Sequence, residues 1–100
     1  MINCMVSKNN NSYQIEVQGH SGYETIGKDI VCSSVSTAMI LTVNLLDKLN
    51  YKFDFESNDK IPMMKLTITN YDSTAETILD NLIDCLKQVE SEYHKYLKIK

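Results

Sequence analysis

Near the start of the chain, hydrophobic and polar residues alternate in two short segments. The apolar positions are every second residue, namely Ile2, Cys4 and Val6 and then Tyr13, Ile15 and Val17. A period of two is typical of a β-strand that buries one face. The polar residues 8–12 between the segments predict a turn, so the two strands are expected to form a hairpin. Gly19 would end the second strand and place His20 at the edge of the sheet.

The period changes to that of a helix over residues 31–50. Apolar residues recur there at helical spacing, at Val31, Val35, Ala38, Leu45, Leu46 and Leu49. Asp29 stands where an N-cap is expected, because an Asp side chain accepts hydrogen bonds from the free N–H groups of a first helical turn. This helix start would place Cys32 in the first turn.

The second half of the chain repeats the order of two strands and a helix. Alternation predicts strands around Tyr51, Phe53 and Phe55 and around Met64, Leu66 and Ile68, joined by a turn that contains Pro62. Ser73 and Glu76 have the spacing of a capping box, which predicts the start of a second helix. Its apolar stripe would be Ile78, Leu82, Leu86, Val89 and Tyr93, and residues 95–100 are expected to be its solvated end.

These elements predict one two-layer α+β domain over residues 1–100. An antiparallel four-stranded sheet would pack against two helices, in the order strand, strand, helix, strand, strand, helix. Ile40 and Val43 project away from the main stripe of the first helix, which predicts a homodimer contact there. The alternative is that they are scattered surface residues without a role, which are common.

Composition and charge narrow the class of protein. The chain of 100 residues is 43% hydrophobic and 23% charged, with no apolar run long enough to span a membrane, which favours a soluble protein. We find no signal peptide pattern at the start and therefore expect a cytoplasmic location. The net charge is −3 and all ten basic residues are lysine, which argues against direct binding to nucleic acid.

The three cysteines, Cys4, Cys32 and Cys85, are odd in number and widely spaced, so no disulfide framework is expected. Cys4 and Cys85 fall on apolar stripes and are predicted to be buried core thiols. His94 is expected to be a solvated histidine near a helix end. No pair of Cys or His residues has the spacing of metal ligands, so we expect neither a metal nor a cofactor.

Candidate chemistry is concentrated in residues 19–32. All three glycines, Gly19, Gly22 and Gly27, lie in this stretch, which indicates a specially shaped loop between His20 and Cys32. A helix N-terminus and a nearby imidazolium both favour the reactive thiolate form of a cysteine. The backbone N–H groups of Cys32 and Ser33 would be unpaired in a first turn and could hold an oxyanion. Asp29 would either cap the helix or orient His20.

The stretch GHSGYETIGKDIVCSSVS resembles the signature of the ribosomal-processing cysteine protease family. The matching positions are Gly19, His20, Gly22, Tyr23, Gly27, Asp29, Ile30, Val31, Cys32, Val35 and Ser36. The resemblance implies a nucleophile at Cys32, a general base at His20, supporting residues at Asp29 and Ser36, and a substrate loop with Gly19, Gly22, Tyr23 and Gly27. It also implies a homodimer and a peptide groove with an apolar pocket beside Cys32.

By the same resemblance, the substrate would be the N-terminal extension of large-subunit ribosomal protein twenty-seven, removed after an aromatic residue. Departures from the signature are Ser21, Glu24, Ser33 and Ser34, of which Glu24 adds a carboxylate to the loop. Two other readings stay open. The protein could be a non-catalytic, ribosome-associated module that binds a peptide, or a redox sensor in which Cys32 is oxidised. Direct RNA binding ranks last because of the acidic balance.

Overall fold

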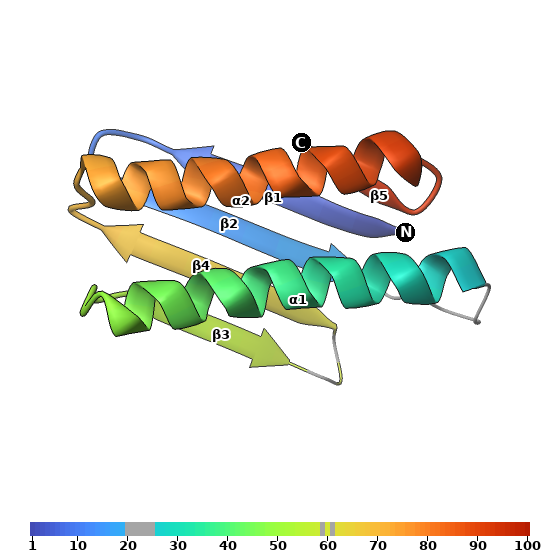
Figure 1. Ribbon diagram of the computed structural model, residues 1–100, viewed down its shortest axis with the longest axis horizontal. Coiled ribbons are helices and arrows are strands. Elements are labelled where there is room, and N and C mark those ends of the chain that lie inside the picture. The colour runs from blue at the N-terminus through green and yellow to red at the C-terminus, as the bar shows by residue number, and fades with distance from the viewer. Residues whose placement is uncertain (20–25, 59, 61) are drawn as a thin grey trace.

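The computed structural model describes residues 1–19, 26–58, 60 and 62–100. In this part of the chain, five strands and two helices follow one another in an α+β order (Figure 1). The elements are β1 (Ile2–Lys8), β2 (Ser12–Gly19), α1 (Ile26–Lys48), β3 (Asp54–Asn58), β4 (Met63–Thr69), α2 (Ser73–Glu92) and β5 (Leu97–Ile99). The predicted order of strands and helices is confirmed up to α2, and the chain then adds a strand.

The sheet is mixed, with the strand order β3-β4-β2-β1-β5. Neighbouring pairs among β1 to β4 are antiparallel, whereas β5 runs parallel to β1, with Leu97 opposite Ile2 and Ile99 opposite Cys4. The prediction of four antiparallel strands was therefore wrong in two respects. The sheet has a fifth strand, and this strand is parallel to its neighbour. A three-residue strand is too short to show a period of two, and the surrounding lysines made residues 95–100 resemble a helix end.

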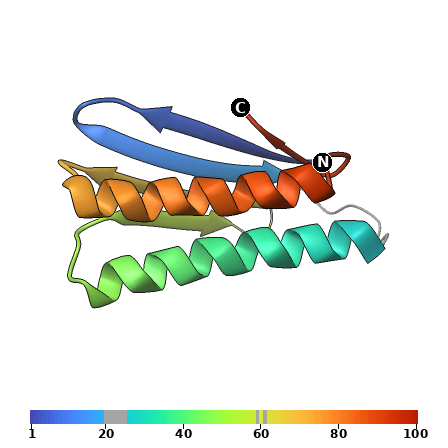
Figure 2. The ribbon, with the colours of Figure 1, turned by 45° about the horizontal axis from the view of Figure 1, so that its top comes forward.

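Both helices cover the same face of the sheet, and the other face is left open (Figure 2). The core lies between the two layers. Its fully buried side chains include Tyr13, Ile15, Met39, Leu46, Leu66, Leu79, Leu82, Leu86 and Leu97. Because side chains alternate along a strand, this arrangement gives each strand one apolar face and one wet face, as the sequence pattern predicted.

Helix α1 begins at Ile26, five residues before the predicted start, and ends at Lys48. Asp29 therefore lies inside the helix, and its predicted position as the N-cap was wrong. The buried stripe also differs, because it continues through Met39, Thr42 and Leu46 and leaves Leu45 and Leu49 exposed. Gly27 has a low helix propensity, which is why residue types alone did not predict a helix start at Ile26.

Helix α1 is more apolar than its buried stripe requires. Ile30–Lys48 has a mean hydropathy of 1.6 and would be long enough to cross a membrane, judged by length and composition alone. One third of this segment is buried inside the protein. The expectation that no apolar run is long enough to span a membrane therefore does not hold for α1 by these two criteria. The remaining face still carries exposed apolar side chains, among which Leu41 is 69% and Ile40 is 42% accessible. Val43, which was predicted to share this face, is half-buried and packs against the core.

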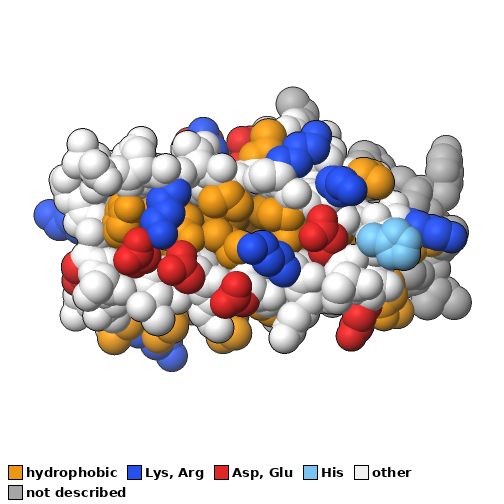
Figure 3. Space-filling model, turned by 90° about the horizontal axis from the view of Figure 1, so that it is seen from above, with side chains coloured by type: hydrophobic (Ala, Val, Ile, Leu, Met, Phe, Trp, Pro, Cys, Tyr) orange, Lys and Arg blue, Asp and Glu red, His pale blue; other side chains and the backbone are white. Residues whose placement is uncertain are grey.

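Helix α2 is capped by Asp72, whose Oδ1 accepts a hydrogen bond of 2.8 Å from the backbone N–H of Ala75. The predicted capping box at Ser73 was thus displaced by one residue. Cys85 is exposed on this helix, so the prediction that it is a core thiol was wrong. Around α2, acidic and basic side chains lie interspersed about an apolar band (Figure 3). Lys8 contributes to this mixture through an ion pair of 2.7 Å with Glu76.

Candidate active site

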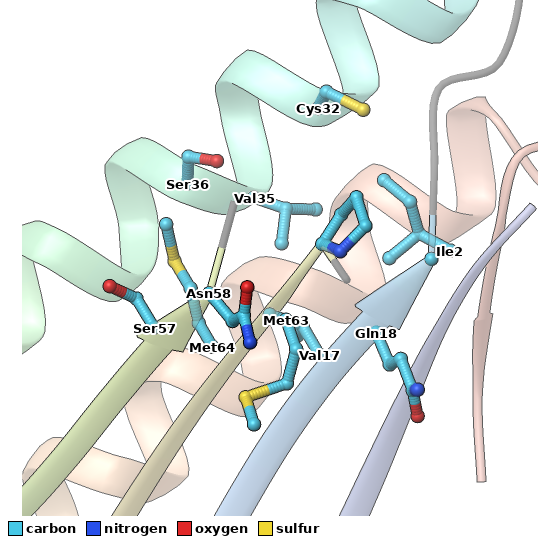
Figure 4. Close-up of a pocket in the computed structure, with 12 residues that line it drawn as sticks. Ile2, Val17, Gln18, Cys32, Val35, Ser36, Ser57, Asn58, Met63 and Met64 are labelled. Atoms are coloured by element: carbon cyan, nitrogen blue, oxygen red, sulfur yellow. The ribbon is translucent and has the colours of Figure 1, made fainter. Parts of the chain in front are cut away.

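A cleft of about 420 Å³ opens between the N-terminal half of α1 and the ends of the strands beneath it (Figure 4). The ends of β2 and β3 and the starts of β1 and β4 meet there, because they lie at the same end of the sheet. The residues that line the cleft are Ile2, Val17, Gln18, Gly19, Cys32, Val35, Ser36, Ser57, Asn58, Pro62, Met63 and Met64.

Cys32 and Ser36 come from α1 and line the cleft from the helix side. They are four residues apart, so they lie one above the other on the same helix face. Both side chains are half-buried, and Val35 beside them is buried in the core. Of the three thiols, only that of Cys32 borders this cleft. The structure thus brings together the predicted nucleophile and one of its predicted supporting residues.

The helix start changes what the backbone near Cys32 can do. In an α-helix the first four N–H groups are unpaired, and in α1 these belong to residues 26–29. Cys32 and Ser33 lie in the second turn, where N–H groups are engaged in the helical hydrogen-bond ladder. The premise that Cys32 lies in the first turn was therefore wrong, and the oxyanion role of the Cys32 and Ser33 N–H groups stays a prediction. The favourable field of the helix N-terminus is also weaker there, because it falls off within the first turn.

Several predicted site residues lie outside what the structure describes. His20, Gly22 and Tyr23 fall within residues 20–25, and the side chain of Asp29 is likewise not described. Gly27 is the second residue of α1. The predicted contact between His20 and Cys32, and the predicted role of Asp29 in orienting His20, therefore stay predictions. The cap alternative loses its basis, however, since Asp29 is inside the helix.

Gly19, the first of the predicted loop residues, lies at the end of β2 and lines the cleft. Its φ of +136° is a conformation that side chains rarely adopt. A Cβ atom at this position would collide with the backbone carbonyl oxygen of Met1 and would lie 2.9 Å from the Cα of Ile2. The N–H of Gly19 donates a 3.0 Å hydrogen bond to the carbonyl of Pro62, which ties β2 to the β3–β4 connection. Glycine is therefore required for the close approach at this corner.

The floor of the cleft consists of residues that sequence reasoning missed. In the strand register, Met64 lies between Val17 of β2 and Ser57 of β3, and the next position places Met63 between Gln18 and Asn58. Leu66 and Ile68 are buried under the helices, so Met64 shares their face while Met63 points to the opposite face. Strand alternation contained this signal, but only the pairing of β2, β4 and β3 shows that the residues meet.

The other thiols have different surroundings. Cys4 is fully buried in β1, and burial raises the pKa of its thiol to about 11, with a smaller contribution from the charge of Glu90. The prediction of an inert core thiol is confirmed for Cys4. Cys85 is exposed on α2 and does not border the cleft. Within the described residues, no three His, Cys, Asp or Glu side chains are grouped closely enough to hold a metal ion.

Comparison with known proteins places this architecture in a family. Residues 1–98 match the family model described as "Cysteine protease Prp". A search of curated proteins gave no match. Among solved structures, the ribosomal processing protease Prp from S. aureus in complex with a substrate peptide is 21% identical, with a TM-score of 0.90 over 100% of this chain and 98% of that one. A protein from Streptococcus mutans is 20% identical, with a TM-score of 0.88 over 100% and 92%.

Proposed function

The chain belongs to the Prp family of cysteine proteases, and on that premise we propose that it removes the N-terminal extension of large-subunit ribosomal protein twenty-seven. Cleavage would follow an aromatic residue of that extension. The observation that carries the proposal is the position of Cys32, a half-buried thiol on the wall of a cleft with a mainly apolar floor. Support for the substrate comes from the S. aureus protein of the same fold, which is described as a ribosomal processing protease.

In the proposed reaction Cys32 is the nucleophile and His20 the general base. The thiolate attacks the peptide carbonyl, and collapse of the tetrahedral intermediate forms a thioester while the C–N bond breaks. The imidazolium of His20 gives its proton to the leaving amine, and water then hydrolyses the thioester with the imidazole acting as base. Ser36 lies one helical turn from Cys32, close enough along the helix face to support the same substrate segment. Asp29 would orient His20.

The size and lining of the cleft suit an extended peptide. Pockets that bind small ligands typically measure about 300–1,000 Å³, so about 420 Å³ accommodates one large side chain and its neighbouring backbone. Ile2, Val17, Val35 and Met64 offer apolar surface to an aromatic ring. The hydroxyl groups of Ser36 and Ser57 at the rim would contact the peptide backbone.

The test is to incubate the purified protein with a peptide that matches the N-terminus of the source organism's ribosomal protein and to identify products by mass spectrometry. We expect one cut after an aromatic residue in the wild-type protein and none with Cys32→Ala. Cys85→Ala is the matched control, because it removes an exposed thiol on α2 outside the cleft and should retain full activity. Cleavage that persists in Cys32→Ala would contradict the proposed nucleophile. A peptide that stays intact but binds both proteins would instead favour a non-catalytic, peptide-binding module.

We also propose that the protein works in the cytoplasm as a homodimer that uses the exposed face of α1. Ile40, Leu41 and Leu45 are apolar and at least 42% accessible on this face, and burying them against a second copy would remove that surface from water. Leu41→Asp should convert a dimer into a monomer in light scattering after size exclusion. Met5→Asp, on the open face of the sheet, should leave the mass unchanged. A wild-type protein that is monomeric at high concentration would refute the dimer.

A further inference from the structure

One side chain on the floor of the cleft stands out by its length and its position. Val17, Met64 and Ser57 lie side by side on β2, β4 and β3 and share the face that the helices cover. Val17 and Ser57 are short, so Met64 alone reaches far from the sheet in this row. Figure 4 shows its thioether chain rising from β4 toward α1, near Ser36. The Met64 side chain therefore fills part of the space between β4 and α1.

The packing of Met64 leaves it able to move. The residue is half-buried, in contrast to Leu66 and Ile68 further along the same strand face, which are buried in the core. A methionine side chain has three rotatable bonds and no branch, so it adapts its shape to a neighbour at little cost. One side of Met64 packs against the core and the other borders the open cleft. A substrate side chain that enters the cleft would meet this flexible group.

We infer that Met64 determines the size of the substrate side chain that the cleft accepts, an inference that rests on the proposed peptidase function. With methionine present, the cleft has an adjustable floor that closes on an aromatic ring of the size of phenylalanine. Shortening the side chain to alanine deepens the cleft under Ser36 and makes room for a larger ring. The substitution also removes apolar contacts to smaller substrate side chains, so the selectivity of the cleft shifts toward larger ones.

The experiment measures kcat/KM for peptides that differ only at the aromatic residue before the cut, which is replaced by Trp, Phe or Leu. We expect Met64→Ala to raise the ratio of Trp to Phe by about tenfold, since a pocket discriminates by about 10- to 200-fold per methylene group gained or lost. Met64→Leu conserves most of the volume and should keep the wild-type ratio. Each ratio is measured on one protein sample, so a variant that is partly unfolded does not change it.

One control makes the result specific. Met5 lies on β1 outside the cleft and is exposed, so Met5→Ala should leave every rate unchanged. An unchanged Trp-to-Phe ratio in Met64→Ala, or the same shift in Met5→Ala, would overturn the inference.

Failure of the proposed function is recognised separately. If the wild-type protein cuts none of the peptides, their dissociation constants are measured with Cys32→Ala protein, with and without Met64→Ala. A shift of the Trp-to-Phe affinity ratio by Met64→Ala would uphold the role of Met64 in a protein that only binds peptides. An unchanged affinity ratio would refute it.

Discussion

Replacing Gly19 with alanine tests whether the corner of the cleft depends on a backbone conformation that only glycine adopts readily. A residue with a side chain held at φ +136° pays about 1–3 kcal/mol in backbone strain. The new Cβ would also collide with the carbonyl of Met1 and crowd Ile2, whose own N–H donates a 2.8 Å hydrogen bond to Tyr96. We expect a loss of about 2–4 kcal/mol in the free energy of unfolding, because the start of β1 must shift as well.

The free energy of unfolding is measured by urea denaturation with linear extrapolation, and the peptide assay is run on the same samples. Ser12→Ala is the matched control, since it changes a small residue at the other end of β2 and should alter stability by less than about 0.5 kcal/mol. The cleavage rate of Gly19→Ala should fall more than its folded fraction explains, because Gly19 and Ile2 both line the cleft. A stability change below about 0.5 kcal/mol in Gly19→Ala would refute the argument from positive φ and close contact.

Two further predictions concern titrating groups. Because burial raises the pKa of Cys4 to about 11, a thiol reagent near pH 8 should label exposed Cys85 at once and Cys4 only after denaturant is added; early labelling of Cys4 would contradict its burial. Hydrogen bonds from the Ala75 N–H and the Tyr51 hydroxyl hold the pKa of Asp72 below its ordinary value. The carboxylate of Asp72 therefore stabilises the fold fully above the unfolded-state pKa of about 3.9. This stabilisation is lost as the pH falls through the lower folded-state pKa. Asp72→Asn should therefore lower the melting temperature at pH 7, with the difference from wild type narrowing below about pH 4, and a difference independent of pH would contradict this linkage.

Much of the fold could be predicted from the sequence because most strands are half-buried. Alternation over residues 2–6, 13–17 and 64–68 corresponds to β1, β2 and β4, whose buried residues are those that were expected to be inside. Apolar and polar residues also alternate over residues 51–53, but these residues precede β3, which begins at Asp54. Asn50, at φ 64°, redirects the chain after α1. Strand β5 escaped prediction because its partner β1 lies at the other end of the sequence, and the pairing is set by tertiary packing.

The candidate site was predictable only in its reactive residues. A cysteine and a histidine near glycines can be recognised in one stretch of sequence, and Cys32 does line the cleft. The floor of the cleft includes Ser57, Asn58 and Met64, which come from a different part of the chain and carry no reactive group. Their contribution depends on strand register, and a sequence period shows which face a residue takes but not which neighbour it meets.

The pairing of β5 with β1 also bears on the order in which the sheet can be completed. A chain emerges from the ribosome with its N-terminal residues first, so β1 is made before residues 97–99. Until then β1 lacks the carbonyl of Tyr96 that accepts the Ile2 N–H, and Ile2 lines the cleft. Joining segments so distant in sequence costs loop entropy that other contacts must offset. This edge of the cleft therefore depends on the last of the described strands to be synthesised.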